Sequence, residues 1–358
     1  MIYVILGTKG QFTKMFPIMK LFDRHKVPYK FIHTSQHYGI IEDNIKRFKV
    51  RKPDVYLTLK KDDLRNVWDL LIWAPKVLWG ARKLKIKRED WVLMHADTES
   101  TLLSFVIAKF FRAKTAHVES GLRSHNWLEP FPEEIIRTIV DSFSDINFCP
   151  YEHDAQNIRK KTGKVVTNGS VAFDSVNLAF KEEPTGKAKK IMEGKYVLFL
   201  AHRKENFLVR ERVVAIIDIL EEILKGGFKV VWPMHANTEH ELKVKGVWDR
   251  ILKLEKRYNL ERDFIFDYVD FMHLVKNSEF IASDGGGLQK ETYFINKPML
   301  ILRKKTEPEP GVGENSYLSY LDIDKVRYFL DNYKRFKTKT PPIGSPSKMI
   351  VDFFIKNK

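Results

Sequence analysis

The sequence predicts an α/β protein with two Rossmann-like domains, each built on a parallel sheet. The chain has 358 residues, 44% of them hydrophobic, which is enough for two domains of ordinary size. Short apolar segments alternate with segments of helical spacing, as in parallel βαβ units. The alternation stops in a polar stretch at 184–194 and then starts again. We therefore place an N-terminal domain at 1–180, a C-terminal domain at 181–340 and a closing segment at 341–358.

The N-terminal half is expected to begin with a buried strand, "IYVILG" at 2–7, and a helix at 12–25. A helix at 101–113 is apolar on most sides. Another, at 132–144, has Pro132 at its first position and two acids in its first turn, which favour a helix start. The further strands expected in this half are "YKFIHTS" at 29–35, "WVLMHAD" at 91–97, "KTAHVES" at 114–120, "SDINFCP" at 144–150 and "VVTNGS" at 165–170.

The C-terminal half repeats the same alternation. Its longest expected helix, at 209–227, ends in two glycines, which are typical of a helix stop. The last helix, at 347–358, is amphipathic. The strands expected here are "YVLFLAH" at 196–202, "FKVVWPMH" at 228–235, "DFIFDYV" at 263–269, "FIAS" at 280–283 and "PMLILR" at 298–303, and the shorter helices are 271–278 and 288–297.

Composition limits the possible classes of protein. A single cysteine, Cys149, leaves no disulfide framework and no CxxC site, which indicates a reducing compartment, and we expect a cytoplasmic protein. The N-terminus lacks the features of a signal peptide, and no apolar run is long enough to insert in a membrane. The net charge of +16 has three explanations: a lysine-rich surface, attraction of an anionic small molecule, or nucleic acid. No RNP, KH or zinc-finger signature supports nucleic acid.

Polar residues follow many of the expected strands in both halves. They are Asp97, Glu119, His202, His235 and Asp284. The carboxyl ends of parallel strands are where such domains bind ligands and react, so this recurrence predicts a functional edge in each half. For Asp97 alone, the alternative is a cap for the next helix.

Two glycine-containing loops are candidate phosphate sites. "SDGGGLQKE" at 283–291 places Gly285, Gly286 and Gly287 between a strand and a helix, where backbone N–H groups can approach an anion. "GTKGQFTK" at 7–14 carries lysines. A tight turn is the alternative for each loop.

The acids are the candidates for proton transfer. Asp97, Glu119 and the pair Glu133 and Glu134 come from one half and His202 from the other, a set suited to proton removal and return. We expect Glu119 to be exposed, because nothing apolar follows it. Glu134 has the alternative role of serving the helix dipole, and His117, beside the strand core, is predicted to be structural.

These motifs together resemble the non-hydrolysing UDP-N-acetylglucosamine 2-epimerases, over most of the chain and in the same order. The family's HGDTxST appears as "HADTEST" at 95–101, and HVEAGLR as "HVESGLR" at 117–123. PEExNR appears as "PEEIIR" at 132–137, and GHRRENF as "AHRKENF" at 201–207. DYLxFLHL appears as "DYVDFMHL" at 267–274, and TDSGGIQEE as the glycine motif at 283–291.

The resemblance implies a GT-B fold, with a cleft between two Rossmann-like domains and the last helix packed on the first domain. It also implies epimerisation at C2 of a UDP-2-acetamido sugar, without metal or cofactor, through UDP elimination to a 2-acetamidoglucal and re-addition. A homodimer is implied too, with no nucleic-acid partner. The residues implied as catalytic are Asp97, Glu119, Glu133 and His202; as substrate-binding, Lys9, Lys14, Arg137, Phe271, Gly285, Gly286, Gly287 and Glu291; and for a second, activating UDP-GlcNAc, Gln36, Arg203 and His235.

The chain departs from the family pattern at positions expected to grip the diphosphate. Lys9 and Gln11 replace an arginine and a glutamate, Gly285 replaces a serine, and Pro308 replaces an arginine. A lysine is a point charge and does not replace a bidentate guanidinium. Arg303 and its neighbours could compensate. The alternatives are a hydrolysing epimerase, a glycosyltransferase of the same fold, or a nucleotide-sugar-binding protein that has lost turnover.

Overall fold

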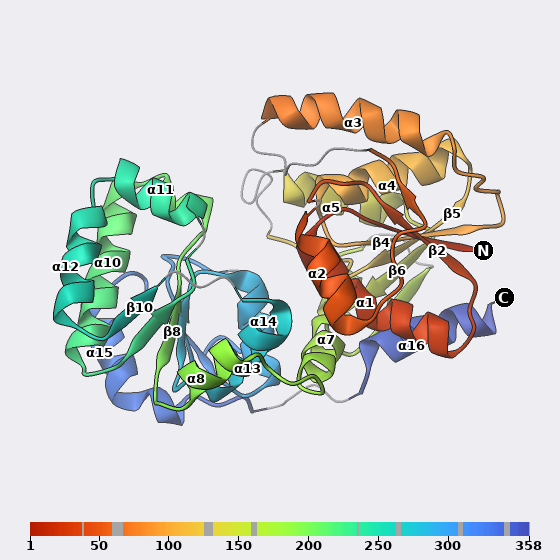
Figure 1. Ribbon diagram of the computed structural model, residues 1–358. Coiled ribbons are helices and arrows are strands. Elements are labelled where there is room, and N and C mark those ends of the chain that lie inside the picture. Colours follow the sequence, from red (N-terminus) through yellow and green to blue (C-terminus); the bar gives the residue numbers. More distant parts are fainter. Residues whose placement is uncertain are drawn as a thin grey trace. The chain divides into compact units, whose positions relative to one another are not determined.

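The computed structural model describes residues 1–37, 39–58, 67–124, 132–158, 163–234, 236–262, 266–306, 311–339 and 344–357. The chain divides into two compact units (Figure 1). Unit 1 comprises Met1–Ser175 with Ile343–Lys358, and unit 2 comprises Val176–Pro342. Each unit is a parallel sheet with helices, so the predicted fold class is confirmed.

The sheet of unit 1 has seven strands in the order β3-β2-β1-β4-β5-β6-β7. Every neighbouring pair in it is parallel. The chain starts in the middle of the sheet, builds outward to β3 and returns to β4, which is the Rossmann order. All five residues of β1 are buried, as expected for a strand covered on both faces. The strands are β1 Ile2–Leu6, β2 Tyr29–His33, β3 Val55–Tyr56, β4 Trp91–His95, β5 Lys114–Val118, β6 Ile146–Cys149 and β7 Lys164–Val166.

The helices of unit 1 include the last helix of the chain. Phe354 of that helix packs against Phe22 and Trp91, with ring centroids 5.9 and 5.7 Å apart, respectively. Figure 1 shows α16 beside α1. The helices are α1 Lys9–Arg24, α2 Gly39–Phe48, α3 Val67–Ala81, α4 Glu99–Phe110, α5 Glu133–Phe143, α6 Glu152–Gln156, α7 Ala172–Ala179, whose later residues belong to unit 2, and α16 Pro346–Lys356.

The sheet of unit 2 has six parallel strands in the order β10-β9-β8-β11-β12-β13, the same Rossmann order. Its core is apolar, with Trp232 and Phe280 almost wholly buried. The strands are β8 Val197–Leu200, β9 Val230–Trp232, β10 Leu260–Arg262, β11 Ile281–Ser283, β12 Met299–Ile301 and β13 Ser316–Leu318. The helices are α8 Gly186–Met192, α9 Lys204–Phe207, α10 Arg210–Lys225, α11 Ala236–Val244, α12 Trp248–Arg257, α13 Tyr268–Asn277, α14 Gly286–Phe294, α15 Ile323–Asn332 and the 3-10 turn η1 Tyr333–Arg335.

Three local predictions are wrong. The described part of the strand expected at 263–269 is a helix start, because Asp267 caps α13 by accepting a hydrogen bond from the N–H of Asp270. The strand is β10, which ends at Arg262. The polar stretch at 184–194 contains helix α8, and Pro132 is the N-cap of α5 rather than its first helical residue.

Among the described residues, no helix combines the length and the apolar character that crossing a membrane requires.

Candidate active site

The turns after β4 and β5 carry two of the predicted acids at the carboxyl edge of the unit 1 sheet. Asp97 lies two residues beyond β4, and Glu119 directly follows β5. The chain order reverses between β1 and β4, so this edge contains the switch point where ligands bind in such sheets.

Asp97 is held by an arginine from α5. Its Oδ2 atom accepts a hydrogen bond of 2.6 Å from Nε of Arg137. Arg137 also lies 3.4 Å from a carboxylate oxygen of Glu134, one helical turn before it. Asp97 does not cap α4, because the cap is Thr98, whose hydroxyl accepts from the N–H of Thr101. The alternative explanation of Asp97 as a helix cap is therefore wrong.

Glu119 is buried, with 4% of its surface exposed, so the expectation of an exposed acid is wrong. Its Oε2 lies 3.0 Å from Nζ of Lys14, and its Oε1 accepts a short hydrogen bond from the hydroxyl of Ser170. The backbone of Glu119 has φ +59°, which turns the side chain out of the strand direction. The acid is buried because these partners compensate its charge, not because apolar residues follow it.

His95, the last residue of β4, lies next to the Glu119 carboxylate. Its Nε2 is 3.4 Å from Oε2 of Glu119, within ion-pair distance but without hydrogen-bond geometry. Burial lowers the pKa of His95, and the Glu119 carboxylate opposes that shift without overcoming it. A neutral imidazole therefore lies against the Glu119 carboxylate.

Glu133 is the first residue of α5. Burial raises the pKa of its carboxyl, and the nearby Asp97 and Glu99 carboxylates raise it further, while its own backbone N–H and Arg137 oppose the shift. Its Oε2 is buried and accepts no hydrogen bond. The raised pKa makes Glu133 a candidate to carry a proton at this edge.

Gln11 is a structural residue, which corrects its assignment to the diphosphate grip. Its side chain is buried, and its Oε1 accepts from the N–H groups of Gly7 and Thr8. Its Nε2 donates to the carbonyl of His95 and the hydroxyl of Thr101, both at 2.9 Å. The Oε1 bonds close the first turn of α1, and the Nε2 bonds hold that turn to the end of β4 and the start of α4.

The residues implied for a second nucleotide-sugar belong to different units. In unit 1, Gln36 is buried, donates to Glu99 at 2.8 Å and accepts from the Ser100 hydroxyl at 2.6 Å. In unit 2, Arg203 pairs with Glu205 at 2.7 Å. His235, like Pro308, lies outside the described residues, so the second site stays a prediction.

Unit 2 has its own turn cluster at the switch point between β8 and β11. Asp284, wholly buried after β11, accepts hydrogen bonds from the backbone N–H groups of His202 and Arg203 and from the amide of Asn206. This buried carboxylate therefore fixes the turn that carries His202. The imidazole of His202 is half exposed.

The glycine turn at the start of α14 is surrounded by cationic side chains. A Cβ on Gly285 would lie 3.3 Å from Cε1 of His202. A Cβ on Gly286 would lie 3.1 Å from a guanidinium nitrogen of Arg203 and 3.3 Å from one of Arg303. Arg303 is itself buried, and its Nε donates to the carbonyl of Asp284 at 2.6 Å. Backbone N–H groups at a helix start, with two guanidinium groups nearby, are a candidate anion site.

The other predicted nucleotide contacts in unit 2 lie on α13 and α14. Glu291 accepts a hydrogen bond of 2.9 Å from the hydroxyl of Tyr268. Burial, reinforced by Glu291, raises the pKa of Tyr268 well above its usual value, so this phenol stays a donor. Phe271 is partly exposed in the first turn of α13. In unit 1, Lys9 is the first residue of α1 and is partly exposed.

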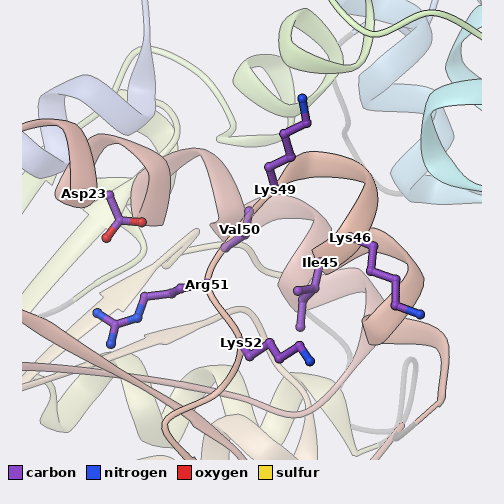
Figure 2. A pocket seen from close by; sticks show the side chains of 7 residues that line it. All are labelled: Asp23, Ile45, Lys46, Lys49, Val50, Arg51 and Lys52. Carbon is purple, nitrogen blue, oxygen red and sulfur yellow. The ribbon is translucent and has the colours of Figure 1, made fainter.

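A cavity of about 670 Å³ lies elsewhere on unit 1 and contains none of the predicted site residues. Figure 2 shows that the charged end of Lys49 points away from those of Lys46 and Lys52. Arg51, also in its lining, pairs with Asp54 at 2.6 Å. This cavity is part of a basic surface, not a convergent anion site.

Three site residues were missed from the sequence: His95, Ser170 and Tyr268. Each acts through a partner far away in the chain, as the 51 positions between Glu119 and Ser170 illustrate. His95 and Tyr268 had a local signal, because they belong to the "HADTEST" and "DYVDFMHL" segments. Within the part of the chain that the structure describes, no three histidine, cysteine or acidic side chains are grouped as metal ligands would be.

The chain is a two-domain α/β protein of GT-B-like fold, because both of its sheets have the Rossmann strand order. One sheet carries acids at its switch point, and the other carries the glycine turn with arginines around it. Residues 19–327 match the family described as UDP-N-acetylglucosamine 2-epimerase. The chain belongs to this family, and the resemblance drawn from its motifs is confirmed.

Curated relatives cover most of the chain. It is 29% identical to the UDP-N-acetylglucosamine 2-epimerase of Campylobacter jejuni, over 100% of this chain and 98% of that protein. It is 30% identical to the UDP-2,3-diacetamido-2,3-dideoxy-D-glucuronate 2-epimerase of Pseudomonas aeruginosa, over 86% of this chain and 84% of that one.

Solved structures share the fold. The structure of S. aureus MnaA with UDP has a TM-score of 0.84 at 26% identity, covering 99% of this chain and 96% of that one. The Methanocaldococcus jannaschii UDP-GlcNAc 2-epimerase in complex with UDP-GlcNAc and UDP also gives 0.84, at 24% identity, covering 99% of each chain.

Proposed function

We propose that this protein inverts C2 of a UDP-2-acetamido sugar, with UDP-GlcNAc as the first candidate, by eliminating UDP and adding it back. The observation that carries the proposal is the set of three acids at one sheet edge of unit 1. Asp97 is oriented by Arg137, Glu119 is paired with Lys14, and Glu133 has a raised pKa. The three carboxyl groups therefore differ in environment, as acid and base roles require.

The reaction needs both a base and an acid. One carboxylate takes the C2 proton while the C1–oxygen bond breaks and UDP leaves with the bonding electrons, giving a C1–C2 double bond. UDP then adds to C1 again, and a proton is delivered to the other face of C2. In our proposal Glu119 and Asp97 serve as the proton-transfer groups and Glu133 as the protonated partner.

Elimination also requires stabilisation of the leaving diphosphate, because the proton on C2, the carbon that bears the acetamido group, is not acidic. We propose that the glycine turn of unit 2, with Arg203, Arg303 and His202, supplies this stabilisation. Arg303 then compensates for the arginine that Pro308 replaces. Phe271 and Glu291 are proposed contacts of the uridine.

We propose UDP-2-acetamido sugars as the substrate class, because relatives of similar identity are named for different members of that class. We favour an epimerase over a glycosyltransferase because simple glycosyl transfer would not need the set of three acids. The non-hydrolysing reaction is the one that the resemblance implies. A cytoplasmic location stays a prediction from cysteine usage.

We also propose that the protein is a homodimer, formed through the outer faces of α3, α4 and α5. α4 packs against both neighbouring helices. Trp79 of α3, Phe110 of α4 and Phe143 of α5 are 66%, 71% and 63% exposed, respectively. Large exposed aromatic side chains on adjacent helices are typical of an interface. Sedimentation velocity should give a dimer for the native protein and a monomer for Trp79→Glu; a native monomer would refute the proposal.

One experiment tests the reaction. The purified protein is incubated with UDP-GlcNAc in deuterated water, and C2 is followed by NMR. We expect deuterium at C2 of intact UDP-GlcNAc and of its manno epimer. Free N-acetylmannosamine with UDP would show hydrolysis instead, and binding without exchange would show a protein that has lost turnover.

A further inference from the structure

His117 is a wholly buried histidine of β5, two residues before Glu119, and both of its ring nitrogens are engaged. Nε2 lies 2.7 Å from the carbonyl oxygen of Ala96, and Nδ1 lies 2.8 Å from Oδ1 of Asp141. A carbonyl oxygen only accepts, so Nε2 carries a hydrogen. A hydrogen must also lie between Nδ1 and the carboxylate, because two lone pairs at that distance would repel.

The hydrogen bond from His117 to the Ala96 carbonyl fixes the turn that carries Asp97. Ala96 has φ +58°, a left-handed conformation that is unfavourable for alanine. Its N–H donates to the carbonyl of Val118 at 3.0 Å, and its carbonyl accepts from His117. These two bonds hold the strained residue in place, and Asp97 follows it directly.

Asp141 controls the turn that follows Glu119. Its Oδ2 accepts from the N–H of Gly121 at 3.0 Å and from Arg123 at 2.6 Å. Gly121 has φ +87°, and a Cβ there would lie 2.2 Å from the carbonyl oxygen of Asp154, so the turn admits only glycine. Asp141 belongs to α5, the helix that begins at Glu133. One buried pair therefore connects all three acid-bearing segments.

We propose that His117 and Asp141 are positioning residues for the proposed epimerisation: together they fix the turns that aim Asp97 and Glu119 relative to each other and to α5. This inference rests on the proposed function. Neither residue needs to touch the sugar, because His117 acts through the Ala96 carbonyl and Asp141 through the Gly121 N–H.

The charged groups around His117 and Asp141 favour a persistent hydrogen bond between the two side chains. Burial alone would raise the pKa of Asp141, but the hydrogen bonds and charges of His117 and Arg123 hold it below its usual range. The carboxylate of Asp141 therefore stays ionised. Beyond Asp141 and Arg123, the neighbouring titratable groups include His95 on β4, which burial keeps neutral, and Cys149 on β6, whose thiol pKa is raised by burial.

The test compares three variants in the C2 exchange assay, with kcat and KM measured separately. His117→Asn loses the hydrogen bond to the Ala96 carbonyl. We expect kcat to fall about 100-fold while KM changes less than about threefold, because misaligned catalytic groups slow the chemical step. Asp141→Asn can still donate to Nδ1 and accept from Gly121, and we expect a smaller fall of about tenfold. Val140→Ala, the wholly buried neighbour on the same helix, makes a cavity without changing these bonds and should keep kcat.

Each outcome decides one question. Native protein without C2 exchange refutes the proposed function itself. Native exchange with a folded His117→Asn variant whose kcat is within threefold of native overturns the inference. So does a Val140→Ala loss of kcat equal to that of His117→Asn, because stability would then explain both. If His117→Asn does not fold, Asp141→Asn decides: unchanged kcat overturns the inference, and a fall in kcat with KM nearly constant supports it.

Discussion

Nζ of Lys14 lies 3.0 Å from Oε2 of Glu119, joining the second turn of α1 to the turn after β5. The Glu119 side chain is 2% exposed and that of Lys14 is 23% exposed. A lysine that the family pattern assigns to the diphosphate thus balances the charge of a buried acid in this chain. The pair gives Lys14 a role in stability as well as any role in binding.

Lys14→Met should destabilise the protein by about 3 kcal/mol, because it leaves a buried carboxylate without its cation. The double variant Lys14→Met with Glu119→Gln should recover most of that loss, since no charge is then left unpaired. Urea unfolding measures both. Lys26→Met, at an exposed position, is the control and should change stability by less than about 0.5 kcal/mol. A Lys14→Met variant as stable as this control would show that the pair contributes nothing.

Asp97→Asn and Glu119→Gln should each lower C2 exchange by at least about 100-fold, the usual range for a proton-transfer group. Asparagine at 97 can still accept from Arg137, so the fold should survive, as circular dichroism would show. Turnover close to native in either folded variant would remove that residue from its assigned role.

The sequence predicted where these acids lie in the chain but not how they are held. Strand ends can be read from apolar runs and the residues that follow, so the positions of Asp97 and Glu119 at the carboxyl edge were correctly anticipated. Burial of Glu119 depends on Lys14, His95 and Ser170, none of which adjoins it in sequence. A local pattern carries no information on such partners.

Gln11→Glu restores the residue of the family pattern, yet we expect it to destabilise this protein by about 1–3 kcal/mol at neutral pH. A carboxylate would place an oxygen against the carbonyl of His95, where the amide of Gln11 now donates. The loss should shrink in acid, where a protonated carboxyl can donate. Thermal unfolding across pH measures this effect. UDP affinity by calorimetry should stay unchanged, and a tighter affinity would return Gln11 to the diphosphate grip.

Glu133→Gln should change the pH dependence of stability in a defined direction. Burial raises the pKa of Glu133 above its usual 4.5, so the folded state favours the protonated form, and native stability falls as pH rises from about 4.5 through the folded pKa. Glutamine carries no charge and avoids this loss. The variant should therefore match the native protein below pH 4.5 and exceed it in melting temperature at higher pH.

The neighbouring Glu134→Gln is the matched control. Glu134 accepts from the N–H of Ser124 at 3.0 Å and pairs with Arg137, so its loss should lower stability at neutral pH. If Glu133→Gln behaved in the same way as Glu134→Gln, the raised pKa of Glu133 would be contradicted.

The strand expected at 263–269 shows a limit of prediction from sequence patterns. "DFIFDYV" has the apolar content of a strand, but Asp267 caps a helix there, and a short apolar run does not distinguish the two. By contrast, both Rossmann-like domains were predicted correctly, because many alternating elements agree even when single ones fail. Architecture is thus easier to infer than the boundaries of one element.

Arg303→Met should weaken UDP binding by about 10- to 100-fold, because a charged hydrogen bond is worth about 1.5–3 kcal/mol. Its guanidinium lies 3.3 Å from the Cβ position of Gly286, at the start of α14, where we place the diphosphate. Arg303 also donates to the Asp284 carbonyl, so thermal unfolding must confirm that the variant is folded. Arg327→Met, on the exposed face of α15, removes the same charge away from the glycine turn and should leave affinity within about twofold, since surface pairs contribute little. Equal affinities of the two variants for UDP in calorimetry would mean that Arg303 does not hold the diphosphate, and the glycine turn would need another cation.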